Sequence, residues 1–97
     1  MSRANRKDKN HNAIVAALRN ADAMVKDMTG DESIGFDLLV GYCGGLYMLE
    51  VKDGDQPPSR RRLTPNEKKT QADFARVGLT VYLVLDEDEA LSAIGTI

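Results

Sequence analysis

The chain has 97 residues, a length that suits one compact domain built around one hydrophobic core. Its 42% hydrophobic and 29% charged residues exclude a collagen-like, mucin-like or wholly disordered protein, and no apolar run approaches the roughly 18 residues of a membrane span. The net charge of −2 argues against simple non-specific nucleic-acid binding, and the single cysteine, Cys43, excludes an internal disulfide and a cysteine-based zinc site. We therefore expect a cytoplasmic protein with no membrane partner.

The first half of the chain predicts a helix followed by three strands. Residues 1–8 are polar and are expected to be frayed. Apolar residues at helical spacing predict a helix from Asn10 to about Ala21, with Asp8 or Asn10 as its cap. A short strand is expected over 23–26. Two β-rich runs, 36–42 and 46–51, surround Gly44-Gly45 and predict a hairpin. Both runs are apolar at nearly every position, which favours helices on each side of the sheet.

The second half predicts two further helices separated by one strand. Residues 53–62 form a loop that contains two prolines. Thr64 as cap, Pro65 at the first position and Glu67 three residues after the cap are typical of a helix start, and Gly78 ends this helix. A strand is expected over 80–85, and Asp86 can cap a last helix over 87–94. The order α-β-β-β-α-β-α predicts a single α/β sandwich.

Three polar residues interrupt the hairpin strands. Asp37 begins the first strand, and Glu50 and Lys52 end the second, so all three are expected at the open end of the hairpin, with Glu50 and Lys52 on one face. Two converging carboxylates suit a hard divalent cation, and an adjacent lysine suits a phosphodiester reaction, in which it can orient water and offset negative charge. From spacing alone, a simple ion pair between Glu50 and Lys52, with Asp37 capping a turn, is the commoner explanation.

Four segments resemble one nuclease family. Residues 35–42 (GFDLLVGY) and 46–54 (LYMLEVKDG) resemble the PD-(D/E)XK nuclease signature, most closely the small stand-alone VRR-NUC type found in phages and bacteria and related in fold to Holliday-junction resolvases. The similarity continues through 59–67 (SRRRLTPNE) and includes a first helix over 6–19. The resemblance covers nearly the whole chain, 1–97, and implies a single restriction-endonuclease-like domain with a central mixed β-sheet flanked by helices.

The resemblance also implies roles for individual residues. Asp37 and Glu50 would bind Mg²⁺ or Mn²⁺, with the Val51 carbonyl as a third ligand, and Lys52 would orient or activate the attacking water. Gln71 or Glu67 would support Lys52 or that water, and the choice between them stays open. Sequence-independent phosphate contacts are expected from six basic residues: Arg6, Lys7, Arg60, Arg61, Arg62 and Lys68.

The sequence departs from the family at two positions. Phe36 replaces the proline that often precedes the first aspartate, a position that mainly shapes the backbone. Related enzymes tend to carry a metal-binding glutamate on the first helix, where this chain has His11, Asn12 and Ala13. His11 alone could contact phosphate or metal, but a single histidine in a polar stretch is more often an exposed surface residue. Family members of this size often form homodimers, and we expect the same here.

These observations favour a Mg²⁺- or Mn²⁺-dependent, structure-selective DNA endonuclease that acts on branched DNA such as Holliday junctions or flaps. Two alternatives stay open. One is a nucleic-acid-binding module of the same fold without catalytic activity, which the absent first-helix carboxylate suggests. The other is a small interaction protein whose polar strand ends are only ion pairs, and it would have no affinity for DNA at low salt.

Overall fold

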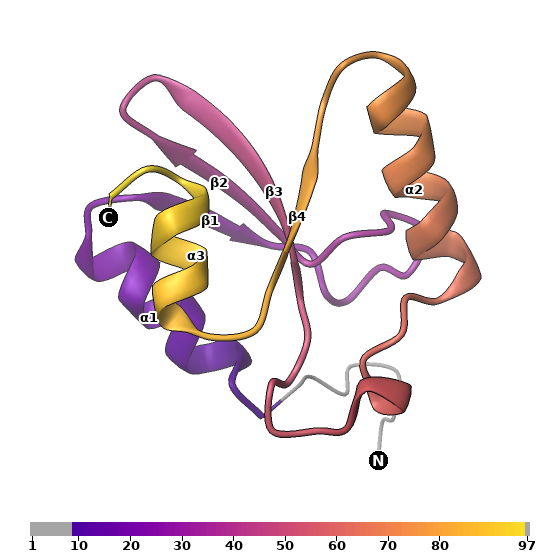
Figure 1. Ribbon diagram of the computed structural model, residues 1–97. Coiled ribbons are helices and arrows are strands. Elements are labelled where there is room, and N and C mark those ends of the chain that lie inside the picture. Colours follow the sequence, from indigo (N-terminus) through magenta and orange to yellow (C-terminus); the bar gives the residue numbers. More distant parts are fainter. Residues whose placement is uncertain (1–8, 97) are drawn as a thin grey trace.

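The structure is a computed structural model, and it describes residues 9–96. It contains the predicted elements in the predicted order, with one short 3₁₀ helix added in the proline-containing loop. Figure 1 shows their arrangement. Their bounds are α1 His11–Asn20, β1 Met24–Asp27, β2 Leu38–Tyr42, β3 Gly45–Val51, η1 Pro58–Arg60, α2 Pro65–Arg76, β4 Val81–Val84 and α3 Glu87–Ala93.

The four strands form one mixed sheet in the order β1-β2-β3-β4. The first three are antiparallel neighbours. Strand β4 runs parallel to β3, because the connection through α2 returns the chain to the end of the sheet at which β3 begins. The hairpin between β2 and β3 closes through Cys43 and Gly44, whose φ values are +47° and +81°. Positive φ at both turn positions gives the twist that a two-residue hairpin needs. The predicted hairpin is confirmed, although its turn consists of Cys43 and Gly44 rather than Gly44 and Gly45, and Gly45 begins β3.

The hydrophobic core lies between the sheet and one helical layer. Helices α1 and α3 lie side by side on the same face of the sheet (Figure 1). The residues of the core cluster come from these two helices, from β1 to β4, from Ala23 and from Ile94 at the end of α3: Ile14, Val15, Leu18, Ala23, Val25, Leu38, Val40, Leu49, Val51, Val84, Ala90 and Ile94. Burying a side chain of this kind contributes about 1.5–3 kcal/mol for the larger aliphatic residues.

Helix α2 lies apart from this core, on the other side of β4 (Figure 1), and none of its residues is buried. The prediction that helices cover both faces of the hairpin strands is therefore met on one face only. Large apolar side chains such as Leu46 and Leu83 stay 65% and 43% exposed. The apolar runs indicated that both faces of the hairpin strands are covered. They do not tell whether the second face is covered by a helix of the same chain or by another surface.

The start of α2 follows the pattern that the sequence predicts. Thr64 Oγ1 accepts from the Glu67 N–H at 3.1 Å, and Glu67 Oε1 accepts from the Thr64 N–H at 2.8 Å. This is a complete capping box, and it satisfies two donors that a helix start otherwise leaves without a partner. Asp86 likewise caps α3 by accepting from the Glu89 N–H. No helix in residues 9–96 is long and apolar enough to cross a membrane.

Candidate active site

The ends of β2 and β3 open into a cleft of about 660 Å³. One wall is the loop over 28–37 that leads into β2, and the other is the first turn of α2. The polar side chains along the cleft are His11, Thr29, Asp31, Glu32, Ser33, Asp37, Glu50, Lys52, Thr64, Asn66 and Glu67. Acidic groups outnumber basic ones along this lining. The cleft is therefore suited to hold a cation or to share protons among carboxylates.

Asp37 lies opposite the end of β3, as the hairpin register requires. Leu38 pairs with Leu49, and the Asp37 N–H extends this ladder by donating to the Leu49 carbonyl at 3.0 Å. Its carboxylate turns toward β3, where Oδ2 accepts from the Val51 N–H at 2.8 Å. Burial raises the pKa of Asp37 above its ordinary value, although the bond from Val51 acts in the opposite direction.

Glu50 is the buried carboxyl group of the site, with 1% of its surface exposed. Its Oε2 lies 3.4 Å from Lys52 Nζ, whereas its Oε1 is buried without a hydrogen-bond partner. Burial, reinforced by the charge of Asp37, raises the pKa of Glu50 to about 10. In this arrangement Glu50 carries a proton at neutral pH unless another positive charge enters the cleft.

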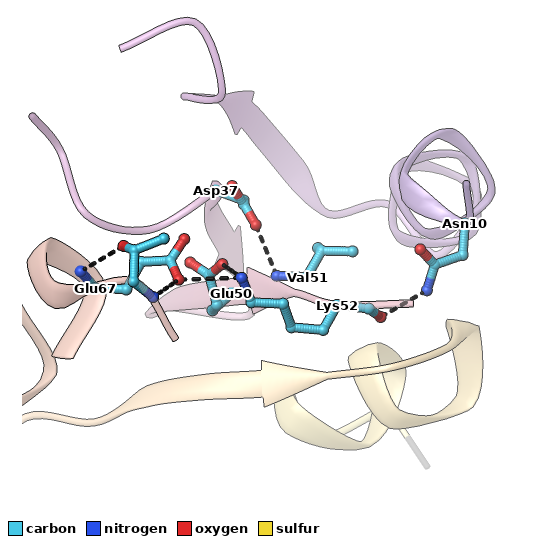
Figure 2. Close-up of polar contacts among 7 residues, drawn as sticks. Asn10, Asp37, Glu50, Val51, Lys52 and Glu67 are labelled. Atoms are coloured by element: carbon cyan, nitrogen blue, oxygen red, sulfur yellow. Dashed lines mark hydrogen bonds and ion pairs between the residues drawn. The ribbon is translucent and has the colours of Figure 1, made fainter. Parts of the chain in front are cut away.

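Lys52 bridges two carboxyl groups. Its Nζ lies 3.0 Å from Glu67 Oε1 and 3.4 Å from Glu50 Oε2, so the predicted same-face pairing of Glu50 and Lys52 is present. Figure 2 shows the Lys52 side chain directed toward Glu50 and Glu67, and the Asp37 carboxylate directed toward Val51. Burial acts to lower the pKa of Lys52, but its bond to Glu67 and the charge of Glu50 outweigh that effect and raise it. Lys52 therefore remains protonated, as an ammonium group.

Glu67 couples helix α2 to the site. The same Oε1 that closes the capping box accepts from Lys52. Burial acts to raise the pKa of Glu67, but hydrogen bonds from Glu50, the Thr64 N–H and Lys52 together lower it. Of the two supporting residues left open by the sequence, the structure brings Glu67 to Lys52, whereas Gln71 lies one turn further along α2 and does not line the cleft.

His11 is buried, and the expectation of an exposed surface histidine is wrong. Only 2% of its surface is exposed, and its Nε2 lies 2.9 Å from Asp27 Oδ2 at the end of β1. Asp27 is held in turn by the N–H and hydroxyl of Thr29. A signal was present in the sequence, because His11 precedes Ile14, Val15 and Leu18 by three, four and seven positions and so lies on the buried face of α1.

The four proposed DNA-contacting residues that the structure describes do not line the cleft. Arg60 ends η1, Arg61 and Arg62 follow it, and Lys68 is on the first half of α2, so all four lie between β3 and the middle of α2. Arg60, Arg62 and Lys68 are exposed, and Arg61 is half-buried. Arg6 and Lys7 lie outside the described residues. Within residues 9–96, no three His, Cys, Asp or Glu side chains form a ready-made cation cluster.

The comparisons with known proteins agree with this architecture. The chain is similar to a solved structure described as a VRR_NUC domain, with a TM-score of 0.61 and 21% sequence identity. The match covers 91% of this chain and 96% of that one. No protein-family model matches the chain, and no curated protein matches it either. The chain therefore has the fold of a VRR_NUC domain, as expected from the sequence resemblance.

Proposed function

We propose that this protein is a nuclease that hydrolyses DNA phosphodiester bonds with a divalent metal ion, and that it selects branched DNA. The observation that carries the proposal is the convergence of Asp37, Glu50 and Lys52 along one cleft, on a fold shared with a VRR_NUC domain. An isolated surface ion pair would not place a fully buried carboxyl group beside a second carboxylate.

The residues present fit a hard cation. Mg²⁺ is commonly held by one or two carboxylates and keeps several waters, so Asp37 and Glu50 are sufficient protein ligands, with the Val51 carbonyl as an additional candidate. The buried Oε1 of Glu50 has no hydrogen-bond partner, so it can serve as a metal ligand. Burial and the charge of Asp37 raise the pKa of Glu50, and a cation bound beside the two carboxylates would offset both effects. A bound Mg²⁺ or Mn²⁺ would supply Lewis-acid stabilisation of charge on the phosphate.

The other residues act on water and on orientation. Lys52 is placed to orient the attacking water and to offset negative charge that develops on the phosphate oxygens, because its ammonium group lies at the cleft within 3.4 Å of Glu50. Glu67 fixes the direction of the Lys52 side chain. Gln71 is kept as a weaker candidate for supporting the water. Arg60, Arg61, Arg62 and Lys68 would contact phosphates further along the strand, as would Arg6 and Lys7. A DNA substrate also favours a cytoplasmic location.

Cleavage assays on defined DNAs test the proposal. Labelled four-way junction, flap and linear duplex DNA are incubated with Mg²⁺, Mn²⁺ or EDTA, and Lys52→Ala is run beside Lys69→Ala. Lys69 is a matched control, since it pairs with the exposed Asp73 on the outer part of α2. We expect metal-dependent cleavage of a branched substrate that is lost in Lys52→Ala and kept in Lys69→Ala. Cleavage of no DNA with either metal would contradict the proposal.

A second candidate is a nucleic-acid-binding module that does not cleave. It is favoured by the two-carboxylate site, since residues 9–96 contain no three-ligand group and the first helix contributes His11 rather than a carboxylate. The two candidates differ in the effect of Glu50→Gln. A binding module would bind junction DNA equally well with and without this change, with no cleavage to lose.

We also propose a homodimer, formed through the edge of the sheet at β4. This strand pairs only with β3 among the described strands, and the segment over 79–85 carries no charge. Exposed edges of this kind normally carry charges or are covered. Tyr82→Lys should dissociate the dimer in light-scattering chromatography, whereas Met24→Lys, on the opposite edge strand and 51% exposed, should not. A monomeric wild-type protein would refute this assembly.

A further inference from the structure

Asn10 occupies the N-cap position of α1 without using its side chain as a cap. Its backbone carbonyl accepts from the Ile14 N–H at 3.1 Å, as a cap residue should, but its side chain makes no bond to the first turn. Asparagine is among the best capping residues, and its capping bond typically contributes about 1 kcal/mol. The helix therefore forgoes a stabilising contact that its sequence could provide.

The side chain is used instead to join the ends of two strands. Asn10 Nδ2 donates to the Lys52 carbonyl at 3.0 Å and to the Leu85 carbonyl. Both partners can only accept, so the NH₂ group must face them. The remaining Oδ1 is then buried without a partner, which is a second local cost. Departures from local rules of this kind are expected where a residue serves a functional site.

The residue that Asn10 holds is the lysine of the proposed active site. Lys52 directly follows β3, and its N–H donates to the Val84 carbonyl at 3.1 Å. Because its carbonyl accepts from Asn10, both backbone polar groups of Lys52 are hydrogen-bonded. The side chain of Lys52 extends away from this anchor to Glu50 and Glu67, as Figure 2 shows. The position of the ammonium group thus depends on where the Lys52 backbone is held.

We propose that Asn10 is a positioning residue for Lys52, and that it fixes the end of β3 through the two carbonyl contacts of its side-chain amide. The proposal rests on the proposed function only in naming Lys52 as the lysine of the reaction. The backbone contact itself is independent of what the cleft does.

Asn10→Ser is the test variant. Serine is an equally good helix cap but is too short to replace both carbonyl contacts, so the start of α1 is kept while the tie to Lys52 is lost. Asn10→Asp has the same shape and capping ability and also lacks the two donors, which provides a second variant if the first is poorly folded. Arg19→Met is the matched control, because Arg19 also ties α1 to a strand carbonyl, that of Val25, away from the cleft.

Two readouts are measured on the wild type and each variant: kcat and KM on the cleaved DNA, and the side-chain ¹H–¹⁵N signal of Lys52, assigned with Lys52→Arg. We expect Asn10→Ser to lower kcat by about tenfold or more with KM within about twofold, and to move or broaden the Lys52 signal. Arg19→Met should change neither, at a similar thermal midpoint.

The two readouts separate the failure of this proposal from the failure of the proposed function. If the wild type cleaves no DNA but Asn10→Ser moves the Lys52 signal, the positioning role stands and the nuclease function falls. If Asn10→Ser and Asn10→Asp leave the Lys52 signal and kcat at wild-type values, the positioning role is overturned. An equal loss of kcat in Arg19→Met would overturn it as well, because the effect would then be one of general stability.

Discussion

At the scale of single residues, one oxygen of Glu67 bonds both to the start of helix α2 and to Lys52, the lysine of the proposed active site. Oε1 accepts from the Thr64 N–H at 2.8 Å and from Lys52 Nζ at 3.0 Å. A glutamine can also close a capping box, whereas it cannot form an ion pair. The two roles of Glu67 can therefore be separated by a change of one functional group.

We predict that Glu67→Gln lowers cleavage by about tenfold or more while the free energy of unfolding falls by about 1 kcal/mol or less. The reason is that the cap survives and the charge that directs Lys52 does not. Cleavage rates and chemical denaturation are measured together. Asp73→Asn is the control, since Asp73 pairs with exposed Lys69 on the same helix at 2.9 Å. Equal effects of the two substitutions would contradict a specific role for Glu67.

The raised pKa of Glu50 predicts that the free energy of unfolding depends on pH in an unusual way. Its pKa is raised from 4.5 to about 10 on folding, so between these values the folded state binds a proton that the unfolded state has released. The folded state loses stability relative to the unfolded state as pH rises through this window. Without divalent cations, Glu50→Gln should therefore become more stable than the wild type by about 1–3 kcal/mol at pH 8, and by less at pH 5. Denaturant unfolding in EDTA at both pH values measures this difference.

Adding a divalent cation should remove that difference. A cation bound at Asp37 and Glu50 stabilises only the folded wild type, by about 2.7 kcal/mol at a concentration of 100 times Kd. Thermal midpoints with and without Mn²⁺ are compared for the wild type and Glu50→Gln. A similar upward shift in both proteins would show that the cation binds elsewhere.

At the scale of elements, α2 is attached to the rest of the described chain through a few specific contacts rather than through a buried face. Asn66 Nδ2 donates to the Glu32 carbonyl at 2.6 Å, and the rings of Phe36 and Phe74 meet edge to face at 6.2 Å. Gly35 approaches Thr70 so closely that a Cβ atom would lie 1.9 Å from the threonine hydroxyl. The loop before β2 therefore helps to position α2, together with the ion pair between Glu67 and Lys52.

Two glycines allow this attachment to be measured. Gly35 and Gly78 have nearly the same positive φ, +85° and +86°, but a Cβ at Gly78 would meet no atom within 4 Å. Gly78→Ala should cost about 1 kcal/mol from backbone strain alone, and Gly35→Ala should cost at least about 1 kcal/mol more. Cleavage should fall only in Gly35→Ala, because that change displaces α2. Equal losses of stability would show that the contact with Thr70 contributes nothing.

At the scale of the whole molecule, the charge distribution matters more than the net charge of −2. Residues 59–76 contain six basic and two acidic residues, and Arg60 to Arg62 lie on the segment that joins β3 to α2. Acidic residues instead line the cleft and begin α3. Under the proposed function, a DNA strand would be held along the basic segment, and a cation would offset the charge of the acidic cleft.

We predict that replacing Arg60, Arg61 and Arg62 together by alanine weakens DNA binding and reduces its salt dependence. Each lost phosphate contact should lower the slope of log K against log salt by about 0.9 for duplex DNA. Fluorescence anisotropy at several salt concentrations gives the slope. Lys26→Ala, on β1 away from this segment, is the control. An unchanged slope in the triple variant would place the DNA elsewhere.

The element order, the hairpin, the Thr64 capping box and the Asp37–Glu50–Lys52 group could all be predicted from the sequence. Each depends on contacts that are local in the chain or that a short turn places in register, so spacing is enough to bring these groups together. The roles of Asp37, Glu50 and Lys52 as a metal and catalytic site were implied by the family resemblance, because spacing alone favoured an ion pair. The short 3₁₀ helix Pro58–Arg60 was missed because a single turn leaves no periodic pattern.

Only the tertiary structure decided how distant side chains share the cleft. It placed Glu67 rather than Gln71 at Lys52, buried His11 against Asp27, and directed Asn10 to the ends of β3 and β4. It also left the face beside α2 open, although the strand pattern favoured a second helical layer. These contacts span 15 to 75 positions in the chain, and their geometry follows from how α1, α2 and the sheet pack. The sequence by itself thus determined the elements and the chemical groups of the site, whereas packing decided which of those groups meet.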